Sequence, residues 1–409
     1  MLRILTQLDQ RQTRLGILNV LGQVATRNLE TRGSLQRRFD DAFFRKERVH
    51  VQDWRRTVQR LKERQPALAK HLEKRGRSIH GEDYWLYAAE RWASDARVLS
   101  GLLSVDEGRT GVYLDLARWC GIIGNTYGLT EAGVILKAIQ PARTELENRE
   151  YNPLLIQDRV QERALITMLL LQADTVTPFF LRELVDNFFR TAGNRTEVQC
   201  LYPAVEALLS VARSGAGLTH ALAVRDVVEY RDRLKSENAS WHNSRPRVEF
   251  LVDLGLLQSE PSTANLHAPT DAGLRAAKLW QSMLDEPRRV QQILDHHFFG
   301  VFAAIHGLSL EPVNDSESRL FALANAFRAP VVRPVGHTPA RSIALLACLD
   351  FLSRGRLVEI SDLLETLRSE SHGRWAALIS FSGGSRLDGE FLIRLDKRLV
   401  SELRGADSS

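Results

Sequence analysis

Apolar residues along this chain recur mostly at the spacing of one helix face, with short glycine, proline or polar breaks between the segments. Residues 1–105 follow this pattern, and residues 156–190 contain two further apolar helices separated by a Thr/Pro turn. The clearest strand-like runs are short and lie near the C-terminus, at 375–381 and 391–395. The pattern therefore predicts a mainly α fold with small β-hairpins, divided among several domains.

One pattern occurs twice: an apolar helix ends in Gly-(Ile/Leu)-(Ile/Leu), and a Thr-(acidic)-Ala-Gly segment follows. The first copy has its glycine at Gly121 and its threonine at Thr130; the second has them at Gly255 and Thr270. A glycine closes the last helical turn in the left-handed conformation, and a threonine caps the first turn of a new helix. Each copy therefore predicts a helix, a short hairpin and a second helix.

This order resembles the third helix, wing and following helix of winged-helix DNA-binding domains. The family inserts the N-terminal end of its third helix into the major groove. By this resemblance, the second copy would present His242, Asn243, Arg245 and Arg247, which are residue types that contact phosphates and base edges. Ser244 is the predicted N-cap of that helix. The resemblance implies DNA binding, with double-stranded DNA favoured.

The breaks divide the chain into four parts. Residues 1–105 form a basic helical N-terminal region, and 106–145 form the first winged-helix-like unit, completed by the preceding helices. Residues 150–285 form the second winged-helix domain, with a helical insertion at 192–240. Residues 286–409 form a C-terminal helical domain with a terminal β-hairpin. Two helices followed by a hairpin also resemble a degenerate third winged helix.

Positive charge is concentrated near the N-terminus. The net charge is only +5, but Thr31 to His80 carries fifteen Lys and Arg against six Asp and Glu, which is +9. Basic helices with an apolar stripe are suited to following a phosphate backbone. The predicted phosphate contacts in this part are Arg37, Arg38, Arg45, Lys46, Arg55, Arg56, Arg60 and Arg64. The wing of the second copy, 258–268, contains no Lys or Arg.

The sequence offers little for catalysis. Cys120, Cys200 and Cys348 lie far apart, which fits neither a disulfide framework nor a zinc site. His296 and His306 are separated by a helical rise of about 15 Å, too far to share an ion. The phosphate-binding Gly-x-x-x-x-Gly-Lys motif is absent. We therefore expect no catalytic residue, metal or cofactor.

These observations predict a cytoplasmic, non-catalytic DNA-binding subunit. By analogy, such subunits belong to bacterial complexes for DNA processing, chromosome organisation or antiviral defence against mobile DNA, with an ATPase or nuclease as a further subunit. No signal peptide or membrane span is expected. Two alternatives stay open: a scaffold whose winged helices dock protein partners, and a metal-dependent nuclease using carboxylates such as Asp388 or Glu390.

Overall fold

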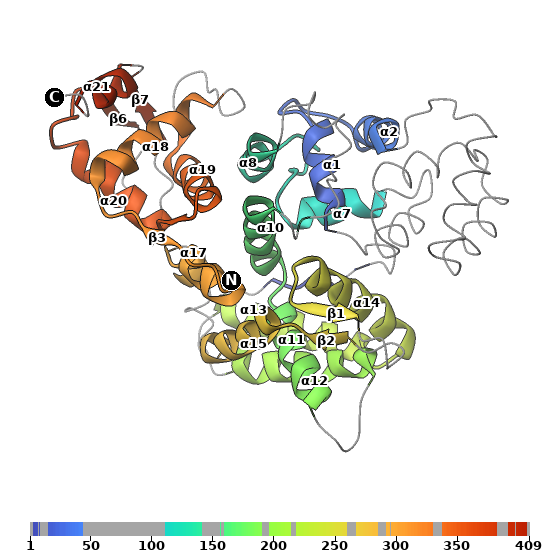
Figure 1. Ribbon diagram of the computed structural model, residues 1–409. Helices are drawn as coiled ribbons and strands as arrows, with labels where there is room; N and C mark the ends of the chain where they lie inside the picture. The colour runs from blue at the N-terminus through green and yellow to red at the C-terminus, as the bar shows by residue number, and fades with distance from the viewer. Residues whose placement is uncertain are drawn as a thin grey trace, which may run out of the picture.

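The computed structural model describes most of the chain outside the 44–110 segment. The described residues are 3–6, 8, 15–43, 111–140, 156, 159–189, 196–213, 218–259, 267–284, 292–294, 296–329, 338–382, 392–396 and 398–406. Helices dominate these residues and the strands are short, which confirms the prediction of a mainly α fold with small sheets (Figure 1).

The N-terminal and central helices are α1 (Ile17–Val24), α2 (Arg32–Phe43), α7 (Gly111–Trp119), α8 (Glu131–Ile139), α10 (Val160–Ala173), α11 (Val176–Phe189), α12 (Glu197–Arg213), α13 (Leu218–Arg233), α14 (Glu237–Asp253) and α15 (Asp271–Leu284). The C-terminal helices are α17 (Phe298–His306), α18 (Ser316–Arg328), α19 (Ala340–Ser353), α20 (Ile360–Glu370) and α21 (Leu399–Ala406). The strands are β1 (Leu257–Ser259), β2 (His267–Pro269), β3 (Glu311–Pro312), β4 (Thr338–Pro339), β5 (Arg356–Leu357), β6 (Ile379–Ser382) and β7 (Leu392–Leu395).

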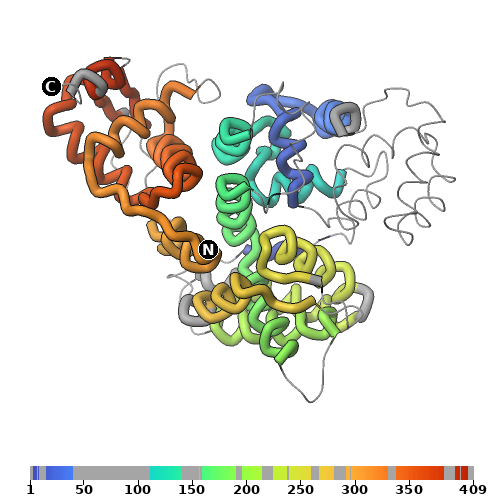
Figure 2. Tube along the Cα trace, in the orientation of Figure 1, coloured from blue at the N-terminus to red at the C-terminus, as the bar shows by residue number. Residues whose placement is uncertain are grey.

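The described elements form three groups, which the tube in Figure 2 separates clearly. We call α1, α2, α7 and α8 the N-terminal unit, α11 to α15 with β1 and β2 the central unit, and α18 to α21 with β4, β6 and β7 the C-terminal unit. The described residues of the predicted insertion at 192–240 include α12 and α13, which pack against each other. α17 and β3 connect the central unit to the C-terminal unit (Figure 1).

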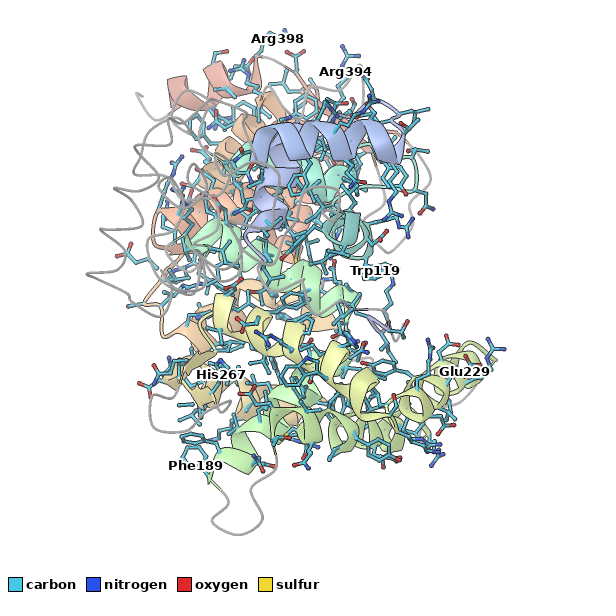
Figure 3. All side chains as sticks on the ribbon, turned by 90° about the vertical axis from the view of Figure 1, so that its right-hand side faces the viewer. Trp119, Phe189, Glu229, His267, Arg394 and Arg398 are labelled. Atoms are coloured by element: carbon cyan, nitrogen blue, oxygen red, sulfur yellow. The ribbon has the colours of Figure 1, made fainter. Side chains whose placement is uncertain are left out.

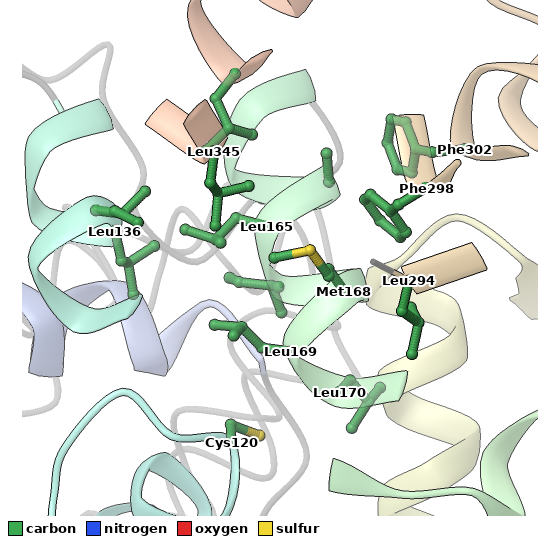
Figure 4. Close-up of a cluster of buried hydrophobic side chains, with 14 of the residues drawn as sticks. Cys120, Leu136, Leu165, Met168, Leu169, Leu170, Leu294, Phe298, Phe302 and Leu345 are labelled. Carbon is green, nitrogen blue, oxygen red and sulfur yellow. The ribbon is translucent and has the colours of Figure 1, made fainter. Parts of the chain in front are cut away.

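α10 lies between these groups, and its apolar residues are distributed around the whole helix. Leu165 and Leu169 are buried, and the helix packs against α8, α17 and α19. Figure 4 shows its side chains between Leu136 of α8, Leu345 of α19 and Phe298 of α17. A helix that is apolar on all sides belongs in a core. The buried residues of the three groups accordingly form one connected hydrophobic core.

The two copies of the repeated pattern have the same backbone geometry. Gly121 and Gly255 have φ values of 70° and 74°, in the left-handed region that favours glycine. After each glycine the chain forms a hairpin: a single bridge between Ile123 and Leu129 in the first copy, and the β1–β2 pair in the second. The predicted order of helix, short hairpin and helix is confirmed in both copies.

The threonines close the two hairpins in the same way. The Thr270 hydroxyl donates to the Gly255 carbonyl at 2.7 Å and accepts from the N–H of Gly273 at 3.0 Å. The Thr130 hydroxyl donates to the Gly121 carbonyl and accepts from Gly133 N–H at 3.2 Å. One hydroxyl therefore caps the new helix and fastens it to the end of the preceding one.

The C-terminal unit contains a three-stranded antiparallel sheet in the order β4-β7-β6. β4 precedes α19, and the hairpin strands β6 and β7 follow α20, so strand and helix alternate before the hairpin. The first hairpin strand begins at Ile379 rather than at the predicted Trp375, which lies in a turn with its side chain buried. β3 and β5 form a separate parallel pair.

Candidate nucleic-acid interface

α14 is the helix predicted to contact DNA, and it begins earlier than expected. Ser236 is extended at its N-cap, and its Oγ accepts a hydrogen bond from the N–H of Ala239 at 3.3 Å. The predicted N-cap, Ser244, is buried inside the helix, and Pro246 also lies within it. The predicted start is therefore wrong. The local Ser-x-Pro signal is overridden because this turn packs into the core, and Ser236 supplies the cap.

Arg247 lies inside the protein, so the predicted contact between Arg247 and DNA is wrong. Its side chain is 0% exposed. Nε and Nη2 donate to the Asp174 carboxylate at 2.7 and 3.0 Å. Nη1 donates to the Tyr230 hydroxyl and the Asn243 carbonyl, and Nη2 also donates to the Leu5 carbonyl. Burial lowers the pKa of the guanidinium, but the charges of and hydrogen bonds to Asp174 and Tyr230 together outweigh this effect and raise the pKa above its ordinary value.

Asn243 is also interior rather than at a DNA-facing surface. Its side chain Nδ2 donates to the Ala239 carbonyl one turn earlier, at 2.8 Å, and the residue is buried. Its Oδ1 has no hydrogen-bond partner among the described atoms. Residue type alone does not show which of Asn243 and His242 faces the interior. Neighbouring residues on a helix point in different directions, and the packing of the helix decides which of them is buried.

His242 and Arg245 are exposed on α14, as the DNA-binding prediction requires. Trp241 lies one helical turn before Arg245, and the Arg245 guanidinium carbon is 5.6 Å from the centre of its ring. Trp241 is 37% exposed, which is unusual for so large an aromatic side chain. We call Trp241, His242 and Arg245 the outer face of α14. Trp241 was not among the predicted site residues, although its i,i+4 spacing from Arg245 could have indicated it.

The described part of the basic N-terminal region provides fewer free cations than its composition suggests. Arg38 forms an ion pair with Glu30, and Arg32 pairs with Asp115 at 3.0 Å. Arg37 is exposed, and its Nε donates to the Gly33 carbonyl of the same helix at 3.3 Å. The other predicted phosphate contacts of this region lie outside the described residues; they are Arg45, Lys46, Arg55, Arg56, Arg60 and Arg64.

The wing beside α14 is short of positive charge where it is described. β1 and β2 contain no Lys or Arg. His267 on β2 contacts the carboxylate of Glu197 at the start of α12 through Nδ1. This wing therefore supplies little positive charge to a phosphate backbone.

No metal-binding arrangement is evident within the described ranges. They contain no cluster of three His, Cys, Asp or Glu side chains that could hold a metal ion. Burial, followed by Arg163 and Arg275, lowers the pKa of His306 to about 3, so this histidine stays neutral. Asp388 and Glu390 lie outside the described residues.

An apolar cavity lies between α10, α11, α15 and α17. Its lining includes Leu171, Pro178, Trp280 and Phe302, and its volume is about 30 Å³. Among the described helices, none alone is long and apolar enough to cross a bilayer. α10 and α11 together have the length and apolar composition of a span, but the pair is bent by 103°.

Comparison with protein-family models, with curated proteins and with solved structures finds no match for this chain.

Proposed function

We propose that the three units are divergent winged-helix domains. The two glycine-closed helices, their hairpins and their threonine-capped helices support this for the N-terminal and central units. For the C-terminal unit, the support is a hairpin that follows two helices and pairs with an earlier strand. In each case the helix before the hairpin corresponds to the recognition helix: α7, α14 and α20.

We propose further that the chain is a non-catalytic DNA-binding subunit, and that α14 is its principal recognition helix. The observation that carries this proposal is the outer face of α14, where Trp241, His242 and Arg245 are all exposed. The excess of basic residues between positions 31 and 80 would add attraction to phosphates that does not depend on DNA sequence.

A fluorescence-anisotropy titration of the full chain with labelled duplex DNA tests this function. We expect an affinity that falls steeply as salt rises, because counterions are released on binding. Arg245→Glu should weaken binding by about tenfold, which corresponds to the 1–3 kcal/mol of a specific contact.

Arg398→Glu is the matched control for this charge reversal. Arg398 is 68% exposed, and Figure 3 places it at the opposite end of the molecule from His267 of the central unit. We expect this control to weaken binding much less than Arg245→Glu. Equal losses in the two variants, or an affinity independent of salt, would contradict the assignment of α14.

For the C-terminal unit we propose a protein partner instead of DNA. The first two turns of α20 carry the half-buried Asp362, whose carboxylate lies 3.9 Å from the Arg319 guanidinium, and the exposed Glu365; the exposed Arg368 comes only after them. Carboxylates at the leading end of a recognition helix repel phosphates, whereas they suit a partner protein with basic residues. We therefore expect Arg368→Glu to leave DNA affinity unchanged. A loss as large as that of Arg245→Glu would assign DNA contact to this unit as well.

A further inference from the structure

The outer face of α14 exposes an indole ring, and a fully paired duplex offers no free base face on which this ring could stack. Trp280 and Trp375, by comparison, are only 3% and 5% exposed. The Arg245 guanidinium carbon lies 5.6 Å from the centre of the Trp241 ring, and Trp241 still keeps 37% of its surface exposed. A duplex presents only the edges of its bases in the grooves, because the base faces are stacked on one another. An unpaired base has a free face that can stack on an indole.

Basic residues lie on α14 and in the segment just before it, although they do not extend along the wing. His242 and Arg245 lie on α14, and exposed Arg233 and Lys235 lie at the end of α13 and in the turn before α14. Lys235 also forms an ion pair with Asp232 at 3.0 Å. The turn is held in place by the Ser240 hydroxyl, which donates to the Leu234 carbonyl at 2.7 Å.

The distribution of charge also favours a short single strand over a duplex lying across α14 and the wing. A duplex aligned along both elements would bring phosphates to β1 and β2, which offer no Lys or Arg. A single strand passing over the α13–α14 turn would meet cations and an aromatic ring together. This combination is the one that proteins use to bind unpaired nucleotides.

We propose that Trp241 and Arg245 form a stacking site for an unpaired DNA base. The preferred ligand is then a duplex that carries a single-stranded extension. This inference rests on the proposed DNA-binding function and specifies its substrate. The indole stacks on the base, while Arg245 and the exposed Arg233 and Lys235 neutralise the adjacent phosphates.

The test uses the full chain and three labelled DNAs: a blunt duplex, the same duplex with a ten-nucleotide extension, and a single strand. We expect the extended duplex to bind most tightly. Trp241→Ala should lower the affinity for the extended duplex and the single strand by about tenfold, within the 1–3 kcal/mol of base–aromatic stacking. It should lower the affinity for the blunt duplex much less, and Trp241→Phe should retain most of the preference.

Leu29→Ala is the control for loss of an exposed apolar side chain, since Leu29 is 79% exposed in the N-terminal unit. It should leave all three affinities unchanged. Equal binding of blunt and extended duplexes, with Trp241→Ala binding both as wild type does, would overturn the stacking site and leave the DNA-binding function standing. Failure to bind any of the three DNAs would overturn both.

Discussion

Arg247 of α14 and Asp174, which lies between α10 and α11, form an ion pair in which both side chains are 0% exposed. Asp174 also accepts hydrogen bonds from the N–H of Leu5 at 3.1 Å and from the Thr177 hydroxyl at 2.7 Å. Arg247 donates to the carbonyl of the same Leu5. The pair therefore binds the backbone of the N-terminal segment on both sides and ties it to the central unit.

Removing one partner of this pair should be strongly destabilising. We expect Arg247→Met and Asp174→Asn each to lower the free energy of unfolding by about 3–5 kcal/mol, because a buried charge is left without its partner. Urea unfolding followed by circular dichroism measures the loss. Arg245→Ala, at an exposed position two residues away, should change stability by no more than about 0.5 kcal/mol. Similar effects of Arg247→Met and Arg245→Ala would contradict the buried pair.

The two repeats should respond alike to substitution of their second glycines. A Cβ added at Gly273 would lie 1.9 Å from the Leu256 carbonyl oxygen, and one at Gly133 would lie 2.1 Å from that of Ile122. The backbone would have to move in both, so we expect each Gly→Ala variant to lose about 2–3 kcal/mol.

Gly33→Ala is the matched control for these variants in thermal and urea unfolding. Gly33 also lies in the first turn of a helix, but no atom lies within 4 Å of its added Cβ. We expect it to be neutral or to stabilise the protein by up to about 1 kcal/mol, because alanine favours the helix. A mild effect at Gly133 with a large one at Gly273 would mean that the two repeats do not share this contact.

Sequence reasoning predicted the repeats well because their signals are local. A glycine that must adopt positive φ and a threonine that caps a helix act within a few residues, and Gly121, Gly255, Thr130 and Thr270 all occupy the predicted roles. Two helices were likewise predicted before the C-terminal hairpin, and α19 and α20 occupy that place. These features depend on the backbone, which the sequence constrains directly.

The prediction of exposed residues was less successful, because exposure depends on contacts far apart in the chain. Arg247 has a suitable residue type for DNA, but its partners Asp174 and Leu5 are 73 and 242 residues away. One turn of α14 faces the N-terminal segment. A sequence pattern does not reveal which turn of the helix this is. Trp241 was left out of the predicted contacts for a different reason: those contacts were chosen as residue types that bind phosphates and base edges.

The three cysteines should be unreactive in the folded protein. All three are buried, and burial raises the pKa of the Cys120 thiol to about 12, with Asp174 contributing further. A buried, protonated thiol is a poor nucleophile. We expect a disulfide reagent at pH 8 to modify none of Cys120, Cys200 and Cys348 rapidly in the native state, and all three in urea. A thiol that reacts within seconds in native buffer would contradict this burial.

Glu359 should make the junction between α17 and the C-terminal unit sensitive to pH. Its carboxylate accepts hydrogen bonds from the N–H groups of Phe299 and Gly300 at 3.1 and 2.6 Å, so it caps α17 from a distant part of the chain. Burial raises the pKa of this carboxyl to about 7; the two N–H groups oppose the rise, and Asp362 adds to it. Of the residues packed nearby, Cys348 on α19 stays protonated, because burial and the Glu359 charge raise its pKa.

The sign of the resulting pH dependence follows from proton binding. Between the ordinary pKa of 4.5 and about 7, the folded state holds a proton on Glu359 that the unfolded state releases. Stability therefore falls as pH rises through this window, by about 2–3 kcal/mol, and levels off above it. Glu359→Gln carries no titrating proton, so the difference in unfolding free energy between wild type and this variant should follow the same curve. Because other carboxylates titrate in both proteins, this difference isolates Glu359; a difference that is constant from pH 4.5 to 8 would show that Glu359 has an ordinary pKa.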